Sequence, residues 1–327
     1  MMEYRQLGDT ALSISRLGFG GGPAGGYDYG PVDGEEWKST VHLALERGVN
    51  FFDVANVYGL GRVEELLSEA LGEKRHEVII ATKCGLVWDQ QRKVHRDLRR
   101  KTVIESIEAS LRRLRVDTIP LCQIHWPDPF TPIEETLDAL ALSREQGKFK
   151  YLGVSNFPLD LLRRAHAILP IASNQVAFNL FRREPEGEMF SWCNRSGISI
   201  LAHSGLAQGL LAGRRSIGQR LGTNDVRNRS PYFSVQDRAK KQEVLDAVKA
   251  LSEKRNRPFS AISVRWILDN SEVTAALVGV KNRQQLAENL LAVGWQLSPE
   301  EKKDLSYLSS LCPSGLAGTP AHSSASL

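Results

Sequence analysis

The chain has 327 residues and a formal net charge of +4 at pH 7, because 42 Lys and Arg residues face 38 Asp and Glu residues. So small an excess favours neither a nucleic-acid-binding nor a membrane-surface protein. The four cysteines (Cys84, Cys122, Cys193 and Cys312) contain no C-x-x-C pair, which indicates a reducing compartment and argues against a structural metal.

The N-terminus has no apolar signal core, and no apolar run approaches the ~18 residues of a membrane span. We therefore expect a cytoplasmic protein. The first elements along the chain are two short strands within 4–15, which the sequence predicts as a hairpin turning at Gly8-Asp9.

Short apolar runs then alternate with amphipathic stretches. The runs start at about positions 16, 50, 77, 118, 149, 171, 198 and 273, and helical patterns cover 35–47, 62–71, 101–114, 132–148, 158–169, 239–255 and 259–269. Pro132 and Pro158 stand at first-turn positions of their helices. Eight strands that are apolar on both faces and separated by helices predict a parallel (β/α)8 TIM barrel.

Residues 1–312 are predicted to form this single domain, and the Ser/Ala/Gly/Pro-rich tail 313–327 to be disordered. The glycine- and arginine-rich stretch 213–230 reads as a loop inserted over the barrel mouth. The basic runs 96–101 and 112–117 read as solvated helix faces.

Polar residues end three neighbouring strands. Asp53 ends the second run, Lys83 the third and His125 the fourth, while Tyr58 follows on the loop after the second. Taken singly, each residue has an ordinary alternative role: Asp53 as a helix cap, Lys83 as an exposed strand end, His125 as a core histidine and Tyr58 as a turn aromatic. Together they fall on the carboxyl rim of the barrel, where the active site of this fold lies.

These four side chains suit proton transfer to a carbonyl. Tyrosine, with an ordinary pKa of ~10, is a weak acid that a neighbouring ammonium strengthens, and a carboxylate keeps that ammonium charged and in place. An imidazole can orient the carbonyl oxygen. The set contains no hydride source, so a cofactor is required.

At this point the chain resembles the aldo-keto reductase family, from about residue 3 to residue 308. The resemblance is carried by "FFDVANVYGLGRVEE", "IIATKCG", "LCQIHWPDP", "YLGVSNF", "ASNQVAFNL", "LAQGLLAG" and "GVKNRQQLAENL", in the family's order. It implies that Tyr58 is the general acid, tuned by Asp53 and Lys83, and that His125 orients the substrate. It also implies a nicotinamide cofactor lying across the barrel mouth without a Rossmann domain.

The resemblance also implies cofactor contacts. Ser155, Asn156 and Gln175 would bind the nicotinamide carboxamide; Leu206, Gln208 and Gly209 the pyrophosphate; and Gly279, Lys281, Gln285, Glu288 and Asn289 the adenosine end. Lys281 and Arg283 favour NADP(H) over NAD(H).

His203 replaces the tyrosine that usually stacks on the nicotinamide, and Gly205 replaces a proline. The glycines of 18–26 fit a rim loop better than a phosphate cradle.

Trp126 matches a substrate-lining position of the family, and Tyr27 and Trp88 lie on loops that could reach the same pocket. The favoured function is therefore NADP(H)-dependent reduction of an aldehyde or ketone, reversibly, with a sugar or sugar derivative as one candidate substrate. The alternative is a nicotinamide-nucleotide-binding regulatory subunit like the channel-associated members of the family, and a non-redox barrel enzyme is the remote one.

Overall fold

The centre of the molecule is a closed barrel of eight parallel strands, seen in a computed structural model that describes residues 1–26, 30–222 and 225–312. The strands are β3 (Leu17–Gly20), β4 (Phe51–Asp53), β5 (Ile79–Cys84), β8 (Ile119–Ile124), β9 (Phe149–Ser155), β10 (Ser173–Ala177), β11 (Ser199–His203) and β12 (Val273–Gly279). Neighbours in the barrel follow chain order, and β12 closes on β3. The predicted (β/α)8 barrel is confirmed.

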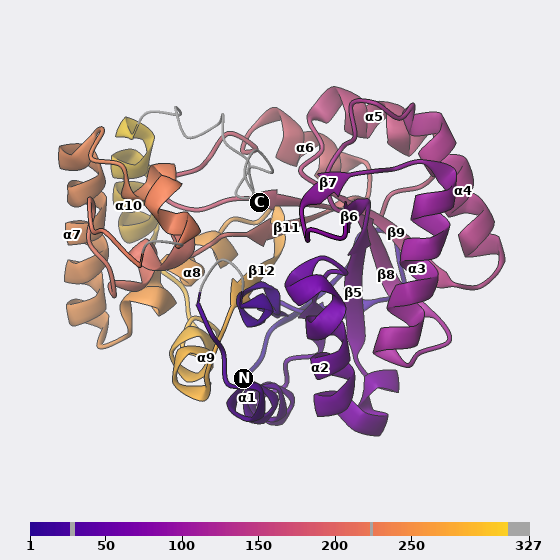
Figure 1. Cartoon of the computed structure of the whole chain (residues 1–327). Helices are drawn as coiled ribbons and strands as arrows, with labels where there is room; N and C mark the ends of the chain where they lie inside the picture. Colours follow the sequence, from indigo (N-terminus) through magenta and orange to yellow (C-terminus); the bar gives the residue numbers. More distant parts are fainter. Residues whose placement is uncertain (27–29, 223–224, 313–327) are drawn as a thin grey trace.

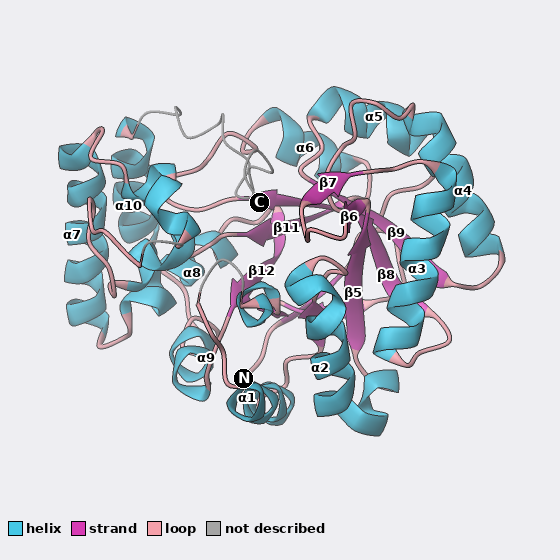
Figure 2. Cartoon of the chain, in the orientation of Figure 1, coloured by secondary structure: helices cyan, strands magenta, loops and turns pink. Residues whose placement is uncertain are grey.

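Helices surround the barrel (Figures 1 and 2). They are α1 (Gly34–Glu46), α2 (Arg62–Leu71), α3 (Arg100–Leu114), α4 (Ile133–Glu145), α5 (Leu159–Ile168), α6 (Glu188–Arg195), α7 (Arg238–Arg255), α8 (Phe259–Leu268), α9 (Arg283–Leu290) and α10 (Pro299–Leu311). All seven predicted helices form, although Pro132 and Pro158 cap α4 and α5 instead of lying in their first turns. α6, α9 and α10 occupy segments for which the sequence predicts no helix.

The predicted N-terminal hairpin, β1 (Tyr4–Gln6) and β2 (Ser13–Ser15), closes the amino end of the barrel. Its turn is anchored by the Gly8 amide, which donates to Ser199 Oγ at 2.7 Å, and by the Asp9 amide, which donates to the Gly197 carbonyl at 3.0 Å. Gly8 has φ +50°, and a Cβ there would lie 2.4 Å from the Gly197 oxygen, so the approach requires glycine. This end is plugged, which leaves the carboxyl end open for chemistry.

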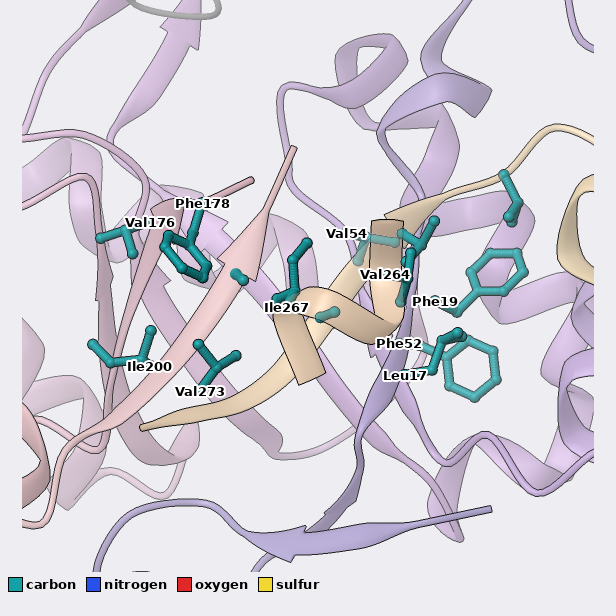
Figure 3. Close-up of a cluster of buried hydrophobic side chains, with 14 of the residues drawn as sticks. Leu17, Phe19, Phe52, Val54, Val176, Phe178, Ile200, Val264, Ile267 and Val273 are labelled. Carbon is teal, nitrogen blue, oxygen red and sulfur yellow. The ribbon is translucent and has the colours of Figure 1, made fainter. Parts of the chain in front are cut away.

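Two apolar layers hold the barrel together. Inside it, Leu7 and Ile14 of the hairpin segment pack with strand residues such as Phe51, Leu121 and Leu201. Outside it, strand side chains pack against the helices, and Figure 3 shows Phe19, Phe52 and Phe178 in one cluster with Val264 and Ile267 of α8. The strands are therefore buried on both faces, as their unbroken apolar runs require.

A second hairpin, β6 (Leu86–Trp88) and β7 (Val94–Arg96), follows β5 and corrects the reading of the basic runs. Arg96 ends a strand and is half-buried, so the prediction of a solvated helix face fails at the start of the first run, whereas Arg100 and Lys101 are exposed in the first turn of α3. In the second run, Arg113 on α3 pairs with Glu64, which is fully buried. Arg112 of the second run is exposed on α3 as predicted, and it is the partners of Arg96 and Arg113 that the spacing of the arginines does not reveal.

The segment between β11 and α7 contributes Arg214, Arg215, Arg227 and Arg229 to the large cavity at the carboxyl ends of the strands, as expected of a loop over the barrel mouth. Within the described ranges, no helix is long and apolar enough to cross a membrane. The tail 313–327, predicted to be disordered, lies outside the described residues, as does Tyr27.

Candidate active site

A cavity of about 450 Å3 opens at the carboxyl ends of the barrel strands. Seven strands contribute to its wall, six of them through residues at or just beyond their ends (Gly20, Asp53, His125, Ser155, His203 and Gly279) and β10 through its middle residue, Gln175. The cavity therefore lies where a (β/α)8 barrel places its active site.

Asp53, Lys83 and Tyr58 meet at the bottom of this cavity. Lys83 Nζ donates to Asp53 Oδ2 at 2.6 Å and to the Val54 carbonyl at 2.9 Å, and lies 3.5 Å from Tyr58 Oη. Asp53 and Lys83 are 4% and 2% exposed, so their charges face one another almost without solvent. The three predicted residues are thus in direct contact.

The segment after β4 presents Tyr58 to the cavity through an unusual turn. Tyr58 begins a short 3-10 turn in which Gly59 and Leu60 have φ of 58° and 53°. A Cβ on Gly25, in the glycine-rich segment after β3, would lie 2.8 Å from the Gly59 nitrogen. The glycines of 18–26 therefore allow close packing against the Tyr58 turn and form part of the rim.

The imidazole of His125 lies beside the phenol ring of Tyr58. Its ring centroid is 5.8 Å from that of Tyr58, and the two planes are nearly perpendicular at 83°. The His125 amide donates to the Cys84 carbonyl at 3.0 Å, which fixes the backbone beside Lys83. Asp53, Tyr58 and His125 therefore line one cavity, and Lys83 contacts Asp53 and Tyr58.

Burial and charge set the proton affinities here. Burial raises the pKa of Tyr58 above its ordinary value of 10.0, and the nearby Lys83 charge opposes that rise without reversing it. The sequence predicted a phenol shifted towards neutrality; in this structure desolvation outweighs the ammonium. Burial alone would favour a neutral Lys83, but Asp53 keeps the pKa of Lys83 above its ordinary value. Tyr58 is consequently a protonated donor beside a charged lysine.

Two glutamines hold the second carboxylate oxygen of Asp53. Gln175 Nε2 donates to Asp53 Oδ1 at 2.8 Å, and Gln123 Nε2 donates to the same oxygen at 3.1 Å. Gln175 Nε2 also lies 3.3 Å from Gln123 Oε1. Sequence reasoning missed Gln123, although its position two residues before His125 places both side chains on one strand face. We call Asp53, Tyr58, Lys83, Gln123 and Gln175 the floor.

The ends of β9 and β11 form a second hydrogen-bonded group. Asn156, with φ 61°, donates through Nδ2 to the His125 carbonyl at 3.2 Å and to Ser155 Oγ at 2.9 Å. His203 Nε2 lies 3.2 Å from Asn156 Oδ1, and its Nδ1 lies 3.0 Å from Ser204 Oγ. The imidazole at this position is thus held on both sides.

The far end of the cavity is strongly cationic. Burial lowers the pKa of Lys281, and the charges of Arg227 and Arg215 lower it further while Asp225 partly opposes them. We call Arg214, Arg215, Arg227, Arg229 and Lys281, which all line the cavity, the cation rim.

Most of the predicted cofactor residues line this one cavity: Ser155, Asn156, Gln175, His203, Leu206, Gln208, Gly209, Gly279, Lys281, Gln285, Glu288 and Asn289. Arg283 is not among the residues of the wall; its guanidinium lies 3.5 Å from the Ser39 carbonyl on α1. Of the predicted substrate residues, Trp126 lines the cavity and Trp88 on β6 does not.

The sequence and the fold are both similar to those of known enzymes. Residues 16–309 match the model of the Aldo/keto reductase family. The aldo-keto reductase YhdN of Bacillus subtilis is 34% identical over 94% of this chain and 93% of its own length. The solved glycerol dehydrogenase of Gluconobacter oxydans has a TM-score of 0.87 and 35% identity, covering 95% of this chain and 96% of its own.

A third relative bears on the cofactor. The NADH-specific methylglyoxal reductase of Escherichia coli is 29% identical to this sequence, over 91% of this chain and 95% of its own length. Its name shows that a relative at this distance uses NADH, so membership of the family does not by itself select NADP(H).

Proposed function

The chain belongs to the aldo/keto reductase family, whose members are NAD(P)H-dependent oxidoreductases acting on carbonyl groups, and we propose that it reduces an aldehyde or ketone reversibly with NADP(H), Tyr58 supplying the proton. The observation that carries this proposal is the contact among Asp53, Lys83 and Tyr58 on the cavity floor.

The nicotinamide end of the cavity has the polar groups that a carboxamide needs. Gln175 lines the cavity, and within the described ranges its Oε1 accepts no hydrogen bond, so it can accept one from an amide NH2. Ser155 and Asn156 lie beside it. When bound there, a reduced nicotinamide supplies the hydride. His203, held by Asn156 and Ser204, occupies the position of the usual stacking aromatic.

The choice of NADP(H) rests on the cation rim. A 2′-phosphate carries close to two negative charges, and Lys281, Arg215 and Arg227 lie close enough for their charges to repel one another. The sequence suggested Lys281 with Arg283; we now assign Arg215 and Arg227 to the role first given to Arg283, because they line the cavity.

Proton delivery follows from the floor. Tyr58 Oη gives its proton to the carbonyl oxygen as negative charge builds there, and the resulting phenolate is stabilised by Lys83. Asp53 keeps Lys83 charged, and Gln123 and Gln175 fix the carboxylate. The imidazole of His125, across from the phenol, positions the carbonyl oxygen for this transfer.

The proposed substrates are small and rich in oxygen, with sugars and sugar derivatives as candidates. The relatives named glycerol dehydrogenase and methylglyoxal reductase support a small oxygenated substrate. A cytoplasmic location is part of the proposal because the four cysteines are free. The alternative, a nucleotide-binding regulatory subunit, would not need Tyr58 and His125, yet this chain keeps the whole set.

Isotope transfer tests the function directly. The protein is incubated with a panel of aldehydes and ketones and with NADPH or NADH carrying deuterium at the transferable C4 position. We expect loss of nicotinamide absorbance and deuterium on the alcohol carbon. Binding of both nucleotides without turnover of any carbonyl would favour the regulatory subunit instead.

A further inference from the structure

The hairpin β6–β7 places one arginine on the substrate side of the cavity. Arg96 ends β7, is half-buried and lines the same cavity as Tyr58 and His125. The hairpin follows β5, whose barrel neighbours are β4 and β8, whereas the proposed cofactor residues stand on β9 to β12 and the segments after them. Arg96 therefore lies across the barrel mouth from the cation rim.

The guanidinium of Arg96 is held in a fixed direction. Its Cζ lies 5.2 Å from the centroid of the Trp126 ring, and Nη1 donates to the Pro127 carbonyl at 3.2 Å. Trp126 directly follows His125, so both anchors belong to the segment that carries this histidine. The Leu98 amide also donates to Asp128 Oδ2 at 3.1 Å, which ties the chain just after β7 to the same segment.

Arg96 makes no ion pair with any carboxylate of the described ranges. Asp97, the next residue in the chain, and Asp128, which follows Pro127, are both hydrogen-bonded to other groups. Asp97 accepts hydrogen bonds from Arg99 and Thr102, and Asp128 accepts from Thr131 and from backbone amides. Among the described residues, only one acceptor is found for the five guanidinium N–H groups, the Pro127 carbonyl.

We infer that Arg96 binds a carboxylate of the substrate, so that the preferred substrates are aldehydes or ketones with a carboxylate a few carbons from the carbonyl. The planar fork of the guanidinium matches a carboxylate in two parallel hydrogen bonds. Arg92, in the turn of the same hairpin, lies on the same cavity wall. The inference rests on the proposed carbonyl reduction.

A matched pair of substrates tests it. Succinic semialdehyde and butanal have the same carbon chain and aldehyde, and only the first carries a carboxylate. We expect kcat/KM for succinic semialdehyde to exceed that for butanal by about tenfold or more at low ionic strength. Arg96→Gln should reduce this ratio about 10–100-fold, mainly through the KM of succinic semialdehyde, and Arg96→Lys should retain part of it.

Lys93→Gln is the matched control, because it removes the same charge from an exposed position of the same hairpin outside the cavity wall. It should leave the ratio within about twofold of the unmodified enzyme. If Arg96→Gln does not fold, succinate should still inhibit butanal reduction by the unmodified enzyme competitively with the aldehyde.

The outcomes separate the two claims. Equal kcat/KM values for the two aldehydes, a ratio unchanged in Arg96→Gln, or the same drop in Lys93→Gln overturns the role of Arg96 while butanal reduction still supports the proposed function. No turnover of either aldehyde, or of any other carbonyl with either nucleotide, overturns the proposed function itself.

Discussion

The floor and the cation rim belong to one cavity but are built in opposite ways. On the floor, the residues Asp53, Lys83, Gln123 and Gln175 are at most 4% exposed, and their side chains are hydrogen-bonded to one another. In the cation rim, Arg214 and Arg229 are exposed, Arg215 and Lys281 are half-buried, and Arg227 is buried. Arg214 pairs with Glu288 on α9. The floor is therefore preorganised in a low-dielectric site, whereas most of the rim is in contact with solvent.

This difference indicates a division of labour. Charges fixed in a water-poor site act strongly on a transition state and are little affected by salt, whereas exposed cations act through screened attraction for an anion. Changes on the floor should therefore lower kcat, and changes on the rim should weaken binding in a salt-dependent way.

The largest expected effect comes from Tyr58→Phe. Without the phenolic proton, kcat for aldehyde reduction should fall by about 10²-fold or more, because a positioned general acid contributes that much. The dissociation constant of NADPH, measured by fluorescence titration, should stay nearly unchanged. Near-full activity would remove Tyr58 from the mechanism.

Lys83→Met tests the electrostatic link on the floor. Turnover should be crippled, because the phenolate loses its counter-charge and Asp53 is left buried without its cation. Since Lys83 lowers a Tyr58 pKa that burial has raised above 10.0, removing it moves that pKa upward. The alkaline limb of the rate profile, where protonated Tyr58 is lost, should therefore shift to higher pH; an unmoved limb with normal rates would make Lys83 structural.

Gln123→Met asks whether the missed glutamine matters. The variant keeps the side-chain length but removes one of the two amide donors to Asp53 Oδ1. We expect kcat to fall by about tenfold, the size of one lost buried hydrogen bond to a charged group, with unchanged cofactor binding. A loss of folding stability with normal kcat would confine Gln123 to a structural role.

Lys281→Met tests the rim. NADPH affinity should fall by about tenfold at low salt and by less at high salt, while NADH affinity stays almost constant. Arg283→Ala is the comparison, because Arg283 lies outside the cavity wall and should change neither constant much. Equal dissociation constants for NADPH and NADH in the unmodified protein would reject the NADP(H) assignment.

The smallest effect on catalysis is expected from a carboxylate in neither region. Hydrogen bonds from Arg255, with help from Ser298 and Lys254, lower the pKa of Glu301 to about 2. Because this pKa is depressed, its stabilisation is present above an unfolded value near 4.5 and is lost as pH falls through about 2. Glu301→Gln should cost about 1 kcal/mol in urea unfolding at pH 7, since Lys254 and Arg255 are solvent-exposed, and less at pH 3, with kcat unchanged.

Much of the fold and the central contacts could be predicted from the sequence. Strands buried on both faces leave unbroken apolar runs, and a charged residue at the end of such a run has to face the barrel mouth, as Asp53 and Lys83 do. The place of Gln123 in the site could also have been predicted, because strand alternation puts its side chain on the same face as that of His125.

Other features depend on contacts that local patterns do not encode. The β6–β7 hairpin has only three residues in each strand and is fixed by packing against Trp126 and Asp128, so Arg96 resembled the start of a helix. Lys281 and Arg283 are two residues apart, yet only Lys281 lines the cavity. Lys281 precedes α9, whereas Arg283 is the first residue of that helix.

The division between floor and rim is tested most directly by the single-turnover rate of NADPH oxidation at saturating cofactor and aldehyde. The rate is compared in the unmodified enzyme, Tyr58→Phe and Lys281→Met. The account predicts a fall of about 10²-fold or more for Tyr58→Phe and a change within about twofold for Lys281→Met, because saturation removes a pure binding defect. Equal falls in the two variants, or an undiminished rate in Tyr58→Phe, would contradict it.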